Sequence, residues 1–198
     1  MKHGNKVFGY MRTLRGSIAS VLTIALFAFF IVVSIFVLLY QSRVDTGIII
    51  ADDIAKLANI FERIEQTCDI VSFEYQKNPI NFLNIKKDGF VGSELGSMNI
   101  AHPDKWEGPY LEENLKMQGK NYQIVRTNLG YFITPGQGVK LPNGNVVGKD
   151  IVFNDHADIA SMTRDKNLLL FENRVLAMPL ALKSLPLALI MYEEDPGV

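Results

Sequence analysis

The fold of this chain is decided by residues 17–40, which read SIASVLTIALFAFFIVVSIFVLLY. This run contains no charged residue, and its polar side chains are serine, threonine and a closing tyrosine. About 20 apolar residues cross a bilayer as a helix, and hydroxyl groups are tolerated there because they bond to the helix backbone. A core helix of a small soluble domain would have a polar face, which this run lacks. We therefore predict a transmembrane helix over residues 17–40.

The charges on either side of this run predict its orientation. Of the 20 basic residues, five lie at or before Arg43, whereas none of the 21 acidic residues lies there. Positively charged flanks stay in the cytoplasm. Residues 1–16 are therefore expected to form a basic cytoplasmic leader, and the mildly acidic remainder an exported domain. A cleaved secretory signal is less favoured, because the run ends in LLYQ rather than in small residues.

Beyond residue 40 the helix becomes amphipathic, with apolar residues on one face only. Apolar residues recur at steps of four and three, the period of one helix face: Ile50, Ile54, Leu57, Phe61, Ile64 and Cys68. The first proline is Pro79, so no proline ends the helix at the membrane surface. We predict one helix of roughly 50 residues, about 75 Å long. Its continuation, residues 41–68, would lie against a globular domain through this stripe.

Residues 69–198 are expected to form that exported domain. Glycine and proline punctuate residues 69–105, which predicts a loop-rich connector with at most a short helix. Residues 122–127 and 131–134 suit strands joined by a tight turn, and residues 139–153 continue in short apolar pieces around Asn143-Gly144, a hairpin signal. Successive hairpins form an antiparallel sheet. The predicted fold class is therefore α+β, with the long helix packed on an antiparallel sheet.

The C-terminal region is apolar again. Residues 168–171 suit another strand. Residues 175–192 are strongly apolar but contain Lys183 and two prolines. A second membrane span would place this lysine near mid-membrane, which costs about 2.5–3.5 kcal/mol on insertion scales. Buried or edge segments of the domain are therefore favoured over a second span.

Residues that would carry catalysis are sparse and unpaired. Cys68 is the only cysteine, expected to be a buried, inert thiol, and the three histidines show no metal-ligand spacing. The chain has no serine elbow or phosphate-binding loop. The scattered lysines of the exported domain do not favour nucleic-acid binding. We expect no enzymatic activity, and the alternative is a tethered enzyme whose groups converge from distant positions.

One acidic cluster suggests a metal. Asp150, Asp155 and Asp158 fall within nine residues of each other, and Ca²⁺ takes six to eight oxygen ligands. These three residues are calcium candidates, although their spacing does not match a twelve-residue calcium loop. The alternative is a solvated acidic loop in which Asp158 caps the following turn.

Residues 106–111 read WEGPYL, an aromatic pair around a Gly-Pro turn, which we expect to fix the connector to the sheet. With the basic leader ending in Arg15-Gly16, the apolar helix, its amphipathic continuation and the sheet, the chain resembles the type IV pilin and pseudopilin superfamily. The similarity to a block of type II secretion pseudopilins is carried by Trp106, Gly108, Pro109, Tyr110 and Leu111.

This resemblance implies a structural subunit without catalysis or cofactor. A prepilin peptidase would cut between Gly16 and Ser17. The protein would cross the inner membrane once, with its C-terminal domain periplasmic or extracellular. Its apolar helix would then pack with like subunits, identical or related, in the core of a secretion or pilus filament.

The chain departs from the family at three points. Ser17 replaces the usual aromatic or apolar residue after the cut, Val21 stands at the fifth mature position in place of the usual glutamate, and a lone cysteine cannot close a C-terminal disulfide loop. In the family that glutamate is thought to pair with a neighbour's terminal amine. A tip-like minor subunit, an uncut membrane protein, and a signal-anchored binding or scaffold module that never assembles are therefore alternatives.

Overall fold

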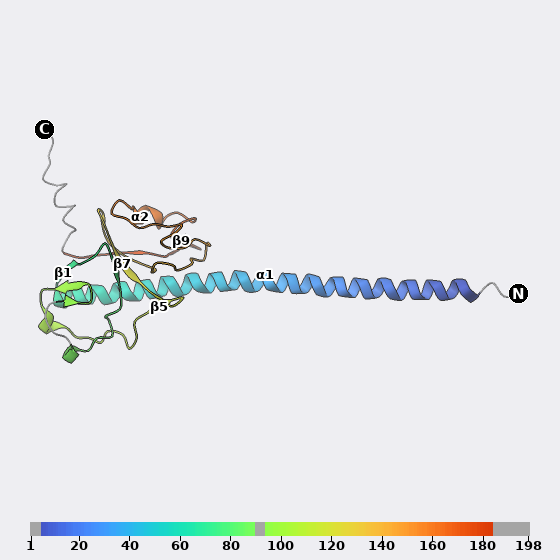
Figure 1. The fold of residues 1–198 in the computed structure, drawn as a ribbon, viewed down its shortest axis with the longest axis horizontal. Coiled ribbons are helices and arrows are strands. Elements are labelled where there is room, and N and C mark those ends of the chain that lie inside the picture. The colour runs from blue at the N-terminus through green and yellow to red at the C-terminus, as the bar shows by residue number, and fades with distance from the viewer. Residues whose placement is uncertain (1–4, 90–93, 184–198) are drawn as a thin grey trace, which may run out of the picture. The chain divides into compact units, whose positions relative to one another are not determined.

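The computed structural model describes residues 5–89 and 94–183, with only the backbone described for residues 5–19, 89, 94 and 95. The chain forms two compact units, Met1–Ser42 and Arg43–Val198. The described part of the first unit is helical, and the second unit contains the strands (Figure 1).

Helix α1 runs from Asn5 to Cys68 without interruption. The prediction of one continuous helix is therefore confirmed, and the helix also includes the backbone of residues 5–16, which we had expected to be a leader only. Neither proline nor a run of glycine interrupts this stretch, so the backbone hydrogen bonds of the helix extend into it. Within the described residues, α1 is the one helix long and apolar enough to cross a membrane.

The main sheet has four antiparallel strands in the order β11-β8-β7-β2. Its centre is the predicted hairpin of β7, Gln123–Thr127, and β8, Gly130–Thr134, with Ile124 opposite Ile133. The outer strands are β2, Lys77–Pro79, and β11, Met178–Leu180. These four strands pack with the second half of α1, as Figure 1 shows for β7. The α+β prediction is confirmed.

Several shorter elements complete the globular domain. A three-stranded sheet joins β1, Ile70–Phe73, to β4, Met98–Ile100, and β4 to β3, Glu94–Leu95. Two hairpins follow, β5 (Lys116–Met117) with β6 (Lys120–Asn121), and β9 (Leu170–Phe171) with β10 (Arg174–Val175). The remaining helical turns are η1 (Lys87–Gly89), η2 (Pro103–Lys105) and α2 (Ile159–Met162).

The connector contains more strand than we predicted. Residues 69–105 contribute β1 to β4, and β1 pairs with β4 through Ile70 opposite Ile100 and Phe73 opposite Met98. Each strand is four residues or shorter. Such short stretches carry too little alternation to be recognised, and their partners lie far along the chain.

The predicted continuation of the meander over residues 139–153 is wrong. This region forms only isolated bridges, Lys140 with Val146 and Val147 with Ile151. Gly144 and Gly148, both at positive φ, close tight turns there. The apolar side chains between these turns enter the core instead of extending the sheet, because the sheet is already flanked by β2 and β11.

The predicted helix stripe lies at the centre of the core. All six of its residues, from Ile50 to Cys68, have 0% of their surface exposed. The ring of Phe61 packs edge-on against Phe73 of β1 and against Phe82. Burying one such side chain stabilises the fold by roughly 1.5–3 kcal/mol, so the stripe is a principal source of stability of the globular domain.

The apolar C-terminal segment joins this core as far as it is described. Leu176, Ala177 and Leu180 are buried, and β11 pairs with β8. Residues 175–180 are thus an edge segment of the domain, as predicted. The rest of the segment, from residue 184, lies outside the described residues.

Candidate functional site

The most conspicuous surface is the apolar part of α1. Every side chain from residue 20 to residue 42 is exposed, including Val21 at 63% and Phe29 at 62%. Soluble monomers rarely expose apolar patches larger than a few hundred Å². Ser34 donates its hydroxyl to the carbonyl of Phe30 at 2.8 Å, which satisfies that group without water. This segment can therefore lie in a bilayer without an unpaired serine hydroxyl at this position.

The predicted cleavage junction lies in the same helix. The backbone at Gly16 and Ser17 is helical. No side-chain contact is described at these two positions. Cleavage between them therefore stays a prediction.

A buried polar contact fixes the second half of α1 to the sheet region. Tyr122, which is fully buried and directly precedes β7, donates its hydroxyl to the carboxylate of Asp53 at 2.8 Å. Burial, and then the hydrogen bond to Asp53, raise the pKa of Tyr122. The phenol therefore stays neutral and keeps donating to the carboxylate.

The block of residues 106–111 is a compact buried turn. Trp106 is fully buried and donates its indole N–H to the carbonyl of Ile85 at 3.1 Å. Its ring meets Tyr110 edge-on, with centroids 4.8 Å apart. Gly108 lies so close to the indole and to the Ile85 carbonyl that a Cβ would collide with both. We predicted that this block would fix the connector to the sheet, but these bonds hold it to the connector itself.

The outer side of the block faces α1. The guanidinium of Arg63 pairs with Glu107 at 2.5 Å and lies 5.6 Å from the ring centroid of Tyr110. A hollow of about 370 Å³ adjoins these groups. Because the pair is exposed, it contributes at most about 1 kcal/mol to stability. The hollow is lined by Lys56, Asn59, Ile60, Arg63, Glu107, Pro109 and Tyr110.

The three calcium candidates are not gathered into one site. Asp150 accepts the backbone N–H of Val146, and Asp158 accepts the N–H and hydroxyl of Ser161. These Ser161 bonds hold the pKa of Asp158 below its usual range. Across residues 5–89 and 94–183, no group of three His, Cys, Asp or Glu side chains could hold a metal ion. The capping role of Asp158 is confirmed, while calcium binding gains no support from the geometry.

The two histidines of the globular domain, His102 and His156, are both exposed. His156 contacts the side-chain amide of Asn128 at 3.1 Å. Neither His102 nor His156 lines either of the two hollows described here. The alternative of a tethered enzyme stays a prediction.

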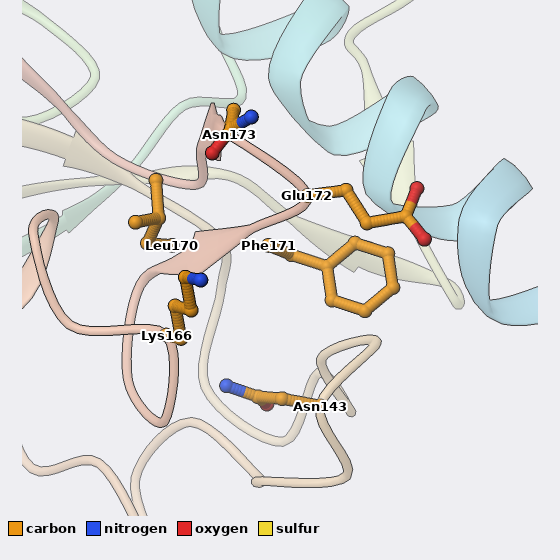
Figure 2. Close-up of a pocket in the computed structure, with 6 residues that line it drawn as sticks. All are labelled: Asn143, Lys166, Leu170, Phe171, Glu172 and Asn173. Atoms are coloured by element: carbon orange, nitrogen blue, oxygen red, sulfur yellow. The ribbon is translucent and has the colours of Figure 1, made fainter.

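A second hollow, of about 550 Å³, lies beside the β9–β10 hairpin (Figure 2). Figure 2 shows the ring of Phe171 and the ammonium group of Lys166 bordering one opening, with Asn143 across it. Asn143 donates to the carbonyl of Leu168 at 2.8 Å, which fixes this wall of the hollow. The sequence did not predict this hollow, and the one signal that pointed to it is Gly47, a lone glycine in the helix that lies against Phe171.

A buried carboxylate at the end of α1 was also missed. Glu65, only 5% exposed, accepts the backbone N–H of Ile70 and that of Lys183, both at 2.7 Å. The ammonium of Lys183 in turn pairs with Asp69 at 2.7 Å. This contact holds the pKa of Asp69 below, and that of Lys183 above, its ordinary value. We call these contacts the Glu65 clasp, and they join α1, β1 and the segment after β11.

Comparisons of the chain with protein-family models, with curated proteins and with solved structures gave no match. The functional argument therefore depends on the chain's own residues and geometry.

Proposed function

We propose that this protein is a pilin-like or pseudopilin-like structural subunit, anchored in the inner membrane, of a type II secretion or type IV pilus type filament. The observation that carries the proposal is the contrast within α1. Its segment from residue 20 to residue 42 is exposed and apolar, while its stripe from Ile50 to Cys68 is completely buried. One helix thus supplies both an anchor and the central element of the exported domain.

The physical basis of assembly is the similarity of lipid and protein interiors. Lipid tails are about as apolar as leucine side chains, so moving an apolar helix from a bilayer into a bundle of like helices costs little hydrophobic stabilisation. Close packing between helices then supplies the driving force. The exposed segment from residue 20 to residue 40 carries no charge that would oppose this transfer.

Processing is tested by the N-terminal residue of the protein isolated from membranes. In the presence of a prepilin peptidase, mass spectrometry should find Ser17 at the N-terminus. Gly16→Leu should leave a precursor that retains Met1. Gly9→Leu, a matched change within the leader, should be processed like the wild type. A wild-type protein that keeps Met1 would refute cleavage at this site.

Assembly is tested by single cysteines placed through residues 24–33. Disulfide crosslinking in membranes should give ladders of multimers if the apolar helices pack together. A cysteine at Leu129, which is exposed in the β7–β8 turn, serves as the control outside the span. The buried native Cys68 is present in every variant. Monomers at every span position would exclude the filament.

The second candidate function is a signal-anchored binding or scaffold module that does not assemble. The observation that favours it is Val21, where the family usually has a glutamate. An ion pair inside an apolar assembly fixes register, and Val21 cannot provide one. If the crosslinking gives monomers while the protein remains in the membrane, this second function holds.

A further inference from the structure

We propose that the hollow beside the β9–β10 hairpin binds the phosphate group of an anionic membrane lipid. This contact would hold the exported domain against the bilayer surface. The proposal rests on the membrane-anchoring part of the proposed function, but it requires neither leader cleavage nor assembly.

The hairpin is held to α1 at a single glycine. A Cβ at Gly47 would lie 2.7 Å from the ring of Phe171 and 3.4 Å from the ring of Pro142. Only a residue without a side chain lets Phe171 approach the helix this closely. Glycine in a helix interior is less favourable than alanine by about 1 kcal/mol, so the position has a packing reason. The tip of the hairpin is thereby fixed to the beginning of the second compact unit.

The chain itself keeps this contact near the membrane surface. Gly47 lies seven residues beyond Tyr40, the last residue of the predicted span. Even a fully extended segment of that length reaches only about 25 Å, and a helical one covers about 10 Å. The hollow is lined in part by Phe171, which contacts Gly47, so the length of this segment sets an upper limit on the distance between the hollow and the end of the span.

The charges at this place suit a lipid phosphate. Lys166 lines the hollow, and its exposed ammonium forms no hydrogen bond or ion pair within the described structure. Arg43 lies one helical turn before Gly47 on the same face of α1, and it is likewise exposed and unpaired among the described residues. Asn173 adds a side-chain amide as a further hydrogen-bond donor. Glu172 also lines the hollow, so Lys166, Arg43 and Glu172 together leave one net positive charge at this place. The two unpaired cations and the amide can then donate to one phosphate group.

The apolar groups of the hollow suit the lipid environment as well. Leu170 and Phe171 line it. Apolar side chains with basic residues at their edge are the usual composition of surfaces that lie at a bilayer interface. The volume of about 550 Å³ falls within the range of about 300–1,000 Å³ that is typical of ligand sites.

The test places a fluorescent label on the full-length protein in vesicles. Val175→Cys puts the label on β10, beside the hollow, and Asp104→Cys puts it in η2, near the end of α1. Because Cys68 is buried, the wild type should remain unlabelled. The vesicles contain phosphatidylcholine, a trace of headgroup spin-labelled lipid and increasing phosphatidylglycerol. We expect quenching at position 175 that rises with phosphatidylglycerol, and little quenching at position 104.

Charge variants test the phosphate contact directly. Arg43→Gln or Lys166→Gln should each raise the anionic-lipid fraction needed for half-maximal quenching by about fivefold, since a basic residue near an anionic surface contributes about that much. Lys56→Gln, which removes another exposed cation of α1, should leave this anionic-lipid fraction unchanged. Added inorganic phosphate should not relieve the quenching; if it does, the hollow binds soluble phosphate and the lipid proposal is wrong.

The possible failures are distinguishable. Protein that does not float with vesicles would refute the anchor and this inference together. Protein that floats but shows equal quenching at positions 175 and 104 would refute only the lipid contact. If quenching is the same in Arg43→Gln and Lys166→Gln as in the wild type, the lipid contact is also refuted.

Discussion

The two halves of α1 belong to one helix and have opposite environments. From residue 20 to residue 42 every side chain is exposed, whereas the stripe from Ile50 to Cys68 is fully buried. The first half is apolar all round, and the second is apolar along one face only. The comparison shows that apolar content alone does not place a helix segment in a protein core. Periodicity does, because a core covers only one side of a surface helix.

The largest expected effect is a difference in unfolding free energy between the same substitution made in each half of α1. Phe61→Ala should lower the free energy of unfolding of the globular domain by about 3–5 kcal/mol, since it leaves a cavity between α1 and the rings of Phe73 and Phe82. Phe29→Ala, the same change in the exposed half, should leave it unchanged. Denaturant unfolding of the full chain in detergent measures both. Equal losses would contradict the division of the helix.

The next largest effect is the loss of stability when the Glu65 hydrogen bonds at the C-terminal end of α1 are removed. Glu65→Ala should cost about 1–3 kcal/mol, because the backbone N–H of buried Ile70 loses its acceptor. Glu62→Ala is the matched control, since Glu62 is exposed on the same helix. Hydrogen exchange at the amides of Ile70 and Lys183 should accelerate in the first variant only. Unchanged protection at both amides would show that the Glu65 clasp is dispensable.

A smaller effect is expected where the two halves of the helix meet. Gly47→Ala should destabilise the globular domain by about 1 kcal/mol, because the shift of Phe171 that it forces outweighs the better helix propensity of alanine. In a Phe171→Ala background the same change should become stabilising. Thermal unfolding of the four proteins of this double-mutant cycle measures the coupling. Additive effects would show that the hairpin does not contact Gly47.

The smallest effect is the pH dependence of the Asp69–Lys183 pair. The pKa of Asp69 lies below its ordinary value of 3.8, so its stabilising contribution is present above pH 3.8 and disappears as the pH falls through the lowered pKa. The raised pKa of Lys183 keeps its contribution below pH 10.5 and loses it as the pH rises further. Lys183→Gln should reduce the loss of stability in acid. An identical acid profile in the variant would exclude this pair as a contributor.

The parts that could be predicted from the sequence have local signals. The apolar run of residues 17–40, the stripe that ends at Cys68 and the hairpin around residues 128–130 each follow from a pattern within a few helical turns or one strand pair. The block at residues 106–111 was recognised as a turn, but its partner was assigned wrongly. Its indole bonds Ile85, 21 residues earlier, and no local pattern identifies that carbonyl.

The sequence by itself determined that α1 has an apolar half and a two-faced half, and that a hairpin would provide the centre of a sheet. Those properties depend on the period of apolar side chains, which is a local property of the sequence. Only the tertiary structure decided that β2 and β11 flank the hairpin, that Glu65 holds Lys183 across 118 residues, and that Phe171 lies on Gly47. The physical reason is that strand pairing and buried hydrogen bonds join groups far apart in sequence, and their partners are chosen by the packing of the whole core.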